Sequence, residues 1–171
     1  VTALISAEIL GVFEVTMLLA AMPHLLAEFG STITVGWIFT AFGLSSAMCA
    51  AIGARIGDIF GRKRILLMAI AAGIIGSLIA GASGGLAGVI IGRILQGSSG
   101  AILPLCIGIV RENVSDKNAS IAIGALTATI TISAGVALIL GGVIVDHLSW
   151  RWIFFAGAGA GVIALLLVSV W

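Results

Sequence analysis

Six long apolar runs, separated by short stretches of charged and turn-forming residues, constrain this chain more than any other feature. The runs cover about residues 1–22, 35–56, 65–82, 86–110, 119–145 and 152–171. A membrane-spanning helix needs roughly 20 apolar residues, whereas membrane strands alternate polar and apolar residues over only about ten. We therefore expect an all-α membrane protein in which residues 1–171 form a single six-helix transmembrane bundle.

The composition supports this prediction and excludes several classes of protein. Charged residues make up 9% of the chain and hydrophobic residues 61%, whereas about a quarter of an ordinary soluble domain is charged. A soluble enzyme, a disordered chain or a nucleic-acid binder needs far more polar or charged surface. The runs hold no Ser/His dyad, paired aspartates or metal-ligand spacing, so we expect no enzyme, no metal and no cofactor.

The loops between the runs differ in charge, and this difference predicts an orientation. Basic loops stay on the cytoplasmic side of a membrane. We therefore expect an integral, multi-pass protein of the plasma membrane with both ends of the chain in the cytoplasm and with Glu28, Asp146 and Trp150 outside. Six of the eight basic residues lie in the loops after the second and fourth runs, namely Arg55, Arg62, Lys63, Arg64, Arg111 and Lys117.

The two halves of the sequence resemble each other. The second run ends in Gly-Ala-Arg-Ile-Gly-Asp58, followed by Arg62, and the fifth ends in Gly-Gly-Val-Ile-Val-Asp146, followed by Arg151. The copies are separated by about half the chain and by an odd number of spans, so they face opposite sides of the membrane. This pattern predicts two inverted three-helix repeats.

Three charged residues fall well inside the runs, where each costs roughly 2.5–3.5 kcal/mol at a helix centre. Glu14 lies nine residues before Pro23, and Arg93 lies about eight residues into the fourth run. At 1.5 Å per residue both are roughly 12–13 Å from the outer end, so they are at matching depths for a pair between helices. Gln96 follows Arg93 by one turn, and Glu8 is expected to line the same cavity from another direction.

Two interpretations of this buried polar group remain open. A static ion pair between Glu14 and Arg93 would hold the helices together. Alternatively, Glu14 would bind and release a proton as Arg93 moves or becomes hydrated, and this proton site would be coupled to transport.

The loop after the second run carries a family resemblance. It reads Gly57-Asp58-Ile-Phe-Gly61-Arg62-Lys63-Arg64 and is similar to the signature G-x-L-A-D-R-x-G-R-K of the major facilitator superfamily. Asp58, Gly61, Arg62 and Lys63 match the signature, whereas Ala54 and Ile59 replace its first Gly and first Arg. In that family the loop forms a charge network that latches the two halves of the transporter in one state. The resemblance covers the whole chain and implies the first six helices of the fold.

Two further motifs carry the resemblance, one to the superfamily and one to its drug:proton antiporters with fourteen helices. Arg93-Ile-Leu-Gln96-Gly is similar to the superfamily's R-x-x-Q-G motif, which is linked to proton coupling. Phe-Glu14-Val-Thr, running on to Ala-Met-Pro23, is similar to L-D-x-T-V-x-N-V-A-L-P, with Glu14 in place of Asp. The Gly-Pro of the antiporter motif in helix 5 is replaced by Ala137 and Leu138, which departs from the pattern of exporters.

The resemblance implies the N-terminal half of a secondary transporter, a proton-coupled exporter of small hydrophobic compounds or drugs that works by alternating access. Its expected partners are the lipid bilayer, the substrate, protons, and a C-terminal half absent from this chain or a second copy. Two alternatives remain: a facilitator or symporter of the same fold for sugars, metabolites or lipids, and a half-bundle that transports nothing.

Overall fold

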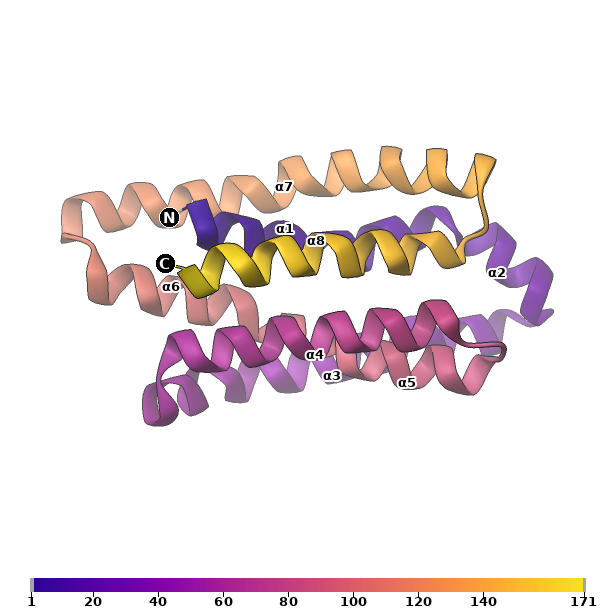
Figure 1. The fold of residues 1–171 in the computed structure, drawn as a ribbon, viewed down its shortest axis with the longest axis horizontal. Coiled ribbons are helices and arrows are strands. Elements are labelled where there is room, and N and C mark those ends of the chain that lie inside the picture. The colour runs from indigo at the N-terminus through magenta and orange to yellow at the C-terminus, as the bar shows by residue number, and fades with distance from the viewer. Residues whose placement is uncertain (1, 171) are drawn as a thin grey trace.

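Six long apolar helices lie side by side along the length of the molecule (Figure 1). The computed structural model describes residues 2–170, except the side chains of residues 116 and 117. Val1, Trp171 and the side chains of Asp116 and Lys117, which belong to the predicted spans and loops, lie outside the described residues. The elements are α1 (Thr2–Ala20), α2 (Met22–Phe29), α3 (Thr32–Phe60), α4 (Arg62–Ala82), α5 (Leu86–Gln96), the 3₁₀ segment η1 (Gly97–Ala101), α6 (Ile102–Asn113), α7 (Asp116–His147) and α8 (Arg151–Val170).

The predicted fold class is confirmed, and the details of the helix ends differ from the prediction. The spans are α1, α3, α4, the composite of α5, η1 and α6, α7, and α8. The first span, α1, ends at Ala20, close to the predicted end at residue 22. The chain then turns at Ala21, and a short separate helix, α2, starts at Met22. Pro23 sits in the first turn of α2, where the missing N–H of proline removes no helical hydrogen bond.

The packing of the spans shows the inverted repeat. The second and third spans, α3 and α4, pack against the fourth, and the fifth and sixth spans, α7 and α8, pack against α1. The third and sixth spans, α4 and α8, also pack against each other. The first helix of each three-helix repeat therefore packs against the other two helices of the other repeat.

Helices α4 and α5 approach closely because glycines face each other at their contact. A Cβ atom added at Gly76 would lie 2.5 Å from the carbonyl oxygen of Gly92, and one added at Gly92 would lie 2.5 Å from the carbonyl oxygen of Gly76. Small residues at such contacts allow helix backbones to pack closely in a membrane. This approach brings Gln96 of α5 into hydrogen-bonding contact with Ser77 of α4.

We predict that Gly76→Ala destabilises the bundle by about 1–3 kcal/mol, the usual cost of overpacking a tight contact. The added methyl group meets backbone atoms of α5, which cannot move aside without separating the helices. Thermal unfolding in detergent measures the change. Gly159→Ala is the control, because a Cβ atom there meets nothing within 4 Å. Equal melting temperatures for the two variants would contradict the predicted effect.

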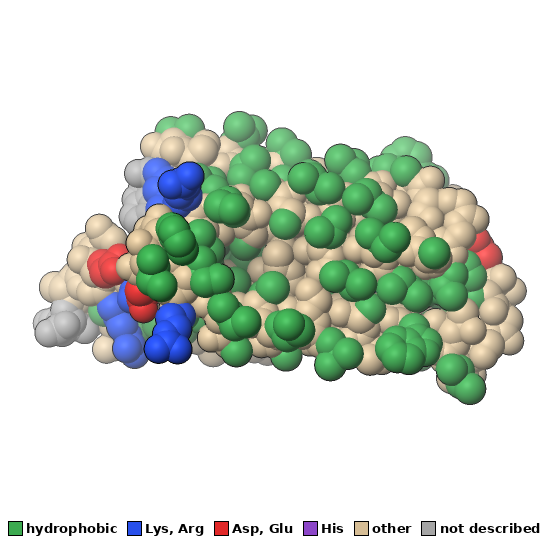
Figure 2. Space-filling model, turned by 90° about the horizontal axis from the view of Figure 1, so that it is seen from below, with side chains coloured by type: hydrophobic (Ala, Val, Ile, Leu, Met, Phe, Trp, Pro, Cys, Tyr) green, Lys and Arg blue, Asp and Glu red, His purple; other side chains and the backbone are tan. Residues whose placement is uncertain are grey.

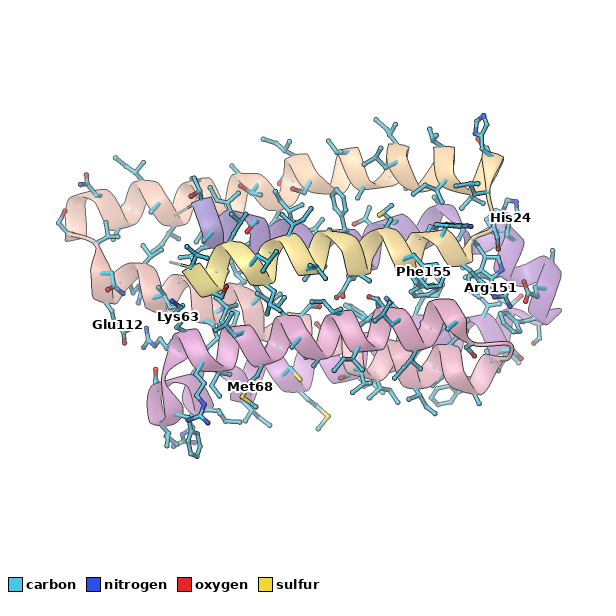
Figure 3. All side chains as sticks on the ribbon, in the orientation of Figure 1. His24, Lys63, Met68, Glu112, Arg151 and Phe155 are labelled. Carbon is cyan, nitrogen blue, oxygen red and sulfur yellow. The ribbon has the colours of Figure 1, made fainter. Side chains whose placement is uncertain are left out.

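Charged side chains gather at the ends of the bundle, and hydrophobic side chains cover the length between them (Figure 2). Arg62, Lys63, Arg64 and Arg111 lie at the end where the chain begins and finishes, which we call the basic end (Figures 1 and 3). Trp150 and Arg151 lie at the opposite end, which we call the tryptophan end. This separation is the one that a membrane-spanning bundle requires, since a charge in the lipid core is costly.

Candidate functional site

Arg93 is the centre of a polar cluster inside the bundle, and its side chain is fully buried. Its Nη1 atom donates one hydrogen bond to the backbone carbonyl oxygen of Glu14 at 2.8 Å and another to Oε1 of Gln96 at 2.9 Å. Its Nε atom donates to the carbonyl oxygen of Ile38 at 3.5 Å, and its guanidinium carbon lies 4.1 Å from the centre of the Phe42 ring. Arg93 therefore joins α5 to both α1 and α3 through charge-assisted and cation–π contacts.

The carboxylate of Glu14 contacts α4 and makes no direct ion pair with Arg93. Its Oε1 atom accepts a hydrogen bond from Oγ of Ser77 at 3.5 Å. Gly73 leaves room for the carboxylate, because a Cβ atom there would lie 2.9 Å from Oε1. No nitrogen of Arg93 lies within 4.0 Å of the carboxylate oxygens. The expected pair is thus replaced by a bond from Arg93 to the backbone of Glu14, because matching depth does not fix the direction of a side chain.

Gln96 and Ser77 connect the guanidinium of Arg93 to the carboxylate of Glu14. Oε1 of Gln96 accepts from Arg93, while its Nε2 atom donates to Oγ of Ser77 at 2.7 Å. Ser77 in turn donates to Glu14. The result is a continuous chain of hydrogen bonds across α5, α4 and α1. The structure therefore brings Glu14, Arg93 and Gln96 together, as the sequence predicted, and adds Ser77.

Three buried polar atoms have no hydrogen-bond partner among the described residues: Oε2 of Glu14, Nη2 of Arg93 and Oε1 of Glu8. An unsatisfied buried polar atom costs about 1–3 kcal/mol, and more when the group is charged. Native proteins carry few such atoms, and they often mark sites with a role beyond packing. All three belong to residues that the sequence singled out.

Glu8 lies apart from this cluster. Its side chain is 5% exposed and lines a hollow of about 330 Å³ between α1, α3, η1 and α7. Neither Glu14 nor Arg93 lines this hollow, so the expectation that Glu8 and Glu14 share one cavity does not hold. Phe42 contacts both regions, because its ring lies against Arg93 and also borders the hollow. Thr16, Ser46 and Ser99 supply further polar groups to its lining.

The fourth span is interrupted directly after Gln96. Residues 97–101 form the 3₁₀ segment η1, which packs against α3. Cβ atoms at Gly97 and Gly100 would lie 2.4 Å from Cβ of Ser45 and 2.2 Å from the carbonyl oxygen of Ser46. Tighter 3₁₀ winding inside a helix is often found at functional positions. The sequence Gly-Ser-Ser-Gly, with two small polar residues between two glycines, indicates this break in the helix, although the hydropathy of the span does not.

The predicted loop motif forms a charge network at the basic end. Nη2 of Arg62 lies 2.7 Å from Oδ1 of Asp58, and Nε of Arg62 lies 3.5 Å from Oε1 of Glu112 at the end of α6. Arg62 also packs over Gly108, where a side chain would collide with the guanidinium. Arg62 thus joins the start of α4 to the ends of α3 and α6.

Three other motif residues shape this corner. Gly61 adopts φ 95°, a conformation that other residues rarely adopt, and allows the chain to reverse between α3 and α4. Gly57 allows close contact with α6, since a Cβ atom there would lie 2.5 Å from Cδ2 of Leu105. Nζ of Lys63 donates to the carbonyl oxygen of Ser169 at 3.3 Å, which ties α4 to the end of α8. Lys63 and Glu112 lie together at this end in Figure 3.

A second network lies at the tryptophan end. The sequence predicted that its residues lie outside the membrane but did not predict that they contact one another. Nε1 of Trp150 donates to Oε2 of Glu28 at 2.6 Å, and Nη2 of Arg151 lies 2.8 Å from Oε1 of Glu28. Nε of Arg151 also donates to the carbonyl oxygen of Ser83 at 3.3 Å. The hydrogen bond from Trp150, together with the nearby Arg151, holds the pKa of Glu28 below its ordinary value.

The two networks occupy corresponding positions in the inverted repeats. At the basic end, the first residue of the third span, Arg62, contacts Glu112 near the end of the fourth span. At the tryptophan end, the first residue of the sixth span, Arg151, contacts Glu28 after the first span. Each pair joins one repeat to the other.

We predict that Glu28 gives the protein a small stability that is lost in acid. Its pKa is lowered on folding, so the contribution is present above the unfolded pKa of about 4.5 and disappears as the pH falls through the folded pKa. The effect is at most about 1 kcal/mol, because both partners are partly exposed. Melting temperatures of the solubilised protein between about pH 6 and pH 3 measure it. Glu28→Gln should lack this acid-dependent loss of stability, whereas the control Asp146→Asn should keep it. If the melting temperatures of Glu28→Gln and of the unmodified protein change identically with pH, Glu28 does not make this contribution.

Comparison with known proteins decides the family. Residues 4–171 match the family model described as Major Facilitator Superfamily. The chain belongs to the major facilitator superfamily. With six apolar spans it is an integral, multi-pass membrane protein of a transporter family.

Members of the superfamily with related sequences come from bacteria and fungi. An uncharacterised MFS-type transporter of Mycobacterium tuberculosis is 29% identical over 98% of this chain and 25% of its own length. Azole resistance protein 1 of Saccharomyces cerevisiae is 31% identical over 92% of this chain and 26% of its own length. The efflux pump dotC of Dothistroma septosporum is 31% identical over 90% of this chain and 27% of its own length. The chain therefore spans about a quarter of the length of these superfamily relatives.

Sequence reasoning on the motifs missed Ser77, which donates a hydrogen bond to the carboxylate of Glu14, and Gly73, which leaves room for that carboxylate. One signal could have found Ser77: it is the one polar residue of α4 after Arg64. A lone serine in an otherwise apolar span needs a hydrogen-bond partner, and one turn before it Gly73 opens a space beside it.

Proposed function

We propose that this chain is the N-terminal six-helix half of a proton-coupled exporter of small hydrophobic compounds. The observation that carries the proposal is the carboxylate of Glu14, which is buried inside the bundle; among the described residues, one of its oxygens has no hydrogen-bond partner and no cation lies within 4.0 Å of it. Binding a proton removes a charge from this apolar interior, and releasing it restores the charge beside the guanidinium of Arg93. Intramembrane carboxylates of this kind commonly serve as proton sites in transporters.

The hollow beside Glu8 supports a place for the substrate. It opens between α1, α3, η1 and α7, and α3 and α7 are the least buried of the six spans. A second bundle packed on this face would close the hollow near the middle of the membrane. Rocking of the two bundles would then expose the site first to one side and then to the other.

The relatives support the direction of transport and the arrangement in the membrane. One relative is named an efflux pump and another an azole resistance protein. The relatives are about four times as long as this chain, which leaves ample length for a second bundle. We place the basic end, and with it both ends of the chain, in the cytoplasm of the cell, since basic loops stay on that side.

A second candidate function is facilitated or proton-driven uptake by the same fold. Helix α7 runs without interruption from Asp116 to His147, with Ala137 and Leu138 where the antiporter motif has Gly-Pro. Proline at that position would remove a backbone hydrogen bond and bend the helix. The uninterrupted fifth span, without this proline, therefore favours a transporter that lacks this feature of the exporters.

The direction of proton movement separates the two functions. The protein is expressed at its natural full length and reconstituted in proteoliposomes with pyranine inside to report pH and with ethidium as a hydrophobic cationic probe. The proposed function predicts that an imposed proton gradient drives ethidium against the proton flow. Ethidium flow in the same direction as protons, or flow that ignores the gradient, would refute antiport and support the second function. Protein-free vesicles give the background.

A further inference from the structure

Ser77 is fully buried in the middle of the bundle and stands between the two charged groups of the site. We propose that Ser77 is a positioning residue: it holds the carboxylate of Glu14 for proton exchange and links that carboxylate to Gln96 and Arg93. This inference rests on the proposed proton site at Glu14 and adds a residue from a third helix, α4, to it.

The first argument is that the hydroxyl group of Ser77 both donates and accepts a hydrogen bond to residues on other helices. Oγ donates to Oε1 of Glu14 at 3.5 Å and accepts from Nε2 of Gln96 at 2.7 Å. A serine within a helix ordinarily turns its hydroxyl to the carbonyl oxygen one turn back, here that of Gly73. The structure shows no such bond for Ser77, so its hydroxyl is directed to Glu14 by contacts with α1 and α5.

The second argument is that neighbouring glycines shape the space around this hydroxyl. A Cβ atom at Gly73 would lie 2.9 Å from Oε1 of Glu14, so a side chain there would push the carboxylate off Ser77. On the other side, Gly157 of α8 covers Ser77, and a Cβ atom there would lie 3.8 Å from Oγ. Both α4 and α8 therefore have a glycine beside the hydrogen bond between Ser77 and Glu14.

The third argument concerns the other charges near Glu14. Arg93 of α5 is the charged group that contacts Glu14 among the described residues, and it does so through the backbone of Glu14. Glu8, on the same helix, faces the separate hollow. The charged residues of α4 and α8 lie at the starts of those helices, and those of α7 lie at its ends. Ser77 therefore makes the side-chain hydrogen bond that links the carboxylate of Glu14 to Gln96, while the hydroxyl group of Ser99 in η1 also acts on that carboxylate.

These contacts allow Oε1 of Glu14 to take up a proton without losing its link to Ser77. In that state the new carboxyl hydroxyl donates to Oγ of Ser77. The hydroxyl proton of Ser77 must then rotate away, and the carbonyl oxygen of Gly73, one turn back on α4, is the acceptor within reach of such a rotation. Gln96 keeps its bond to Oγ in both states. No covalent bond of Ser77 changes; the hydroxyl only exchanges acceptors as the proton arrives or leaves.

Infrared difference spectroscopy of the full-length protein in lipid tests this inference without any substrate. Spectra recorded through a pH titration contain the C=O stretching band of each carboxyl group that becomes protonated. We expect a band that Glu14→Gln removes. Ser77→Ala should shift the frequency of that band, because the carboxyl group loses its partner, and Ser77→Thr, which keeps the hydroxyl, should return it toward the original frequency. Ser98→Ala is the matched control, because Ser98 bonds to the carbonyl oxygen of Ala69 rather than to a carboxylate.

Two results would overturn the proposals, and they are distinguishable. If no band depends on Glu14, the proton site is wrong, and the inference about Ser77 falls with it. If the band is present but has the same frequency in Ser77→Ala as in the control Ser98→Ala, the proton site stands and the proposed role of Ser77 is wrong. The melting temperature of Ser77→Ala is measured in parallel, so that a shift in a misfolded protein is not counted as support.

Discussion

Replacing Glu14 with glutamine is expected to reduce proton-driven transport to the background of protein-free vesicles. Glutamine has nearly the same size, and its amide oxygen still accepts a hydrogen bond from Ser77, so the local packing is kept. What glutamine cannot do is bind and release a proton near neutral pH. The variant should therefore insert and fold normally while losing the coupling of transport to the proton gradient.

The experiment uses the same full-length proteoliposomes, with the proton gradient imposed and ethidium followed by fluorescence. Asp146→Asn is the matched control, since Asp146 is an exposed acidic residue at the end of α7. It should transport as the unmodified protein does. Coupled transport by Glu14→Gln at more than a small fraction of the normal rate would show that the proton binds elsewhere.

Replacing Arg93 with alanine is expected to be the most destabilising change in the site. The variant loses three contacts that hold α5 to α1 and α3 and one contact within α5 to Gln96. It also leaves the carboxylate of Glu14 in the bundle without a nearby positive charge. Removing one partner from a buried charged group costs about 3–5 kcal/mol. Arg93→Lys should also fail in transport, because a lysine ammonium cannot span the carbonyl of Glu14, the amide of Gln96 and the Phe42 ring at once.

A double variant separates the charge effect from the loss of packing. If Arg93 compensates the charge of Glu14, then Arg93→Ala combined with Glu14→Gln should be more stable than Arg93→Ala alone, because no uncompensated charge is left. Thermal unfolding in detergent gives the comparison. Strictly additive losses would show that the two side chains do not interact, and the interpretation of the cluster as a coupled pair would be abandoned.

The six-helix fold could be predicted from the sequence because the lipid environment imposes one simple requirement. Each span must be apolar for about 20 residues, and this length is visible in the sequence. The ends were harder to predict, because polar residues near an interface are tolerated in helices. Thus α3 extends from Thr32 to Phe60, beyond the predicted 35–56. The first span ends at Ala20, and the separate short helix α2, which starts at Met22, was not predicted.

The depth of the site residues in the membrane could be predicted from the sequence, but the direction in which each side chain leaves its helix could not. Helical rise gives depth, and depth correctly brought Glu14 close to Arg93 and Gln96. The direction of each side chain depends on how the helices pack, which single residues do not reveal. The carboxylate of Glu14 therefore contacts Ser77 on α4, and Glu8 lines a separate hollow, whereas the sequence predicted one shared cavity.

The networks at the two ends show the same difference. The loop motif predicted Asp58, Gly61 and Arg62 together because they are close in sequence. Glu28 and Arg151 are 123 residues apart, and no local pattern connects them, although the repeat places them in corresponding positions to Glu112 and Arg62. Long-range pairs of this kind require the inverted packing to be known first.

The central claim is that Glu14 is the proton site and that its proton is coupled to the substrate, and proton release on substrate binding tests it most directly. The full-length protein in detergent is placed in weakly buffered solution with a pH-sensitive dye, and ethidium is added. The unmodified protein should release protons in proportion to the ethidium that it binds, and Glu14→Gln should bind ethidium without releasing any. Equal proton release by the two proteins, or none by the unmodified protein, would contradict the account.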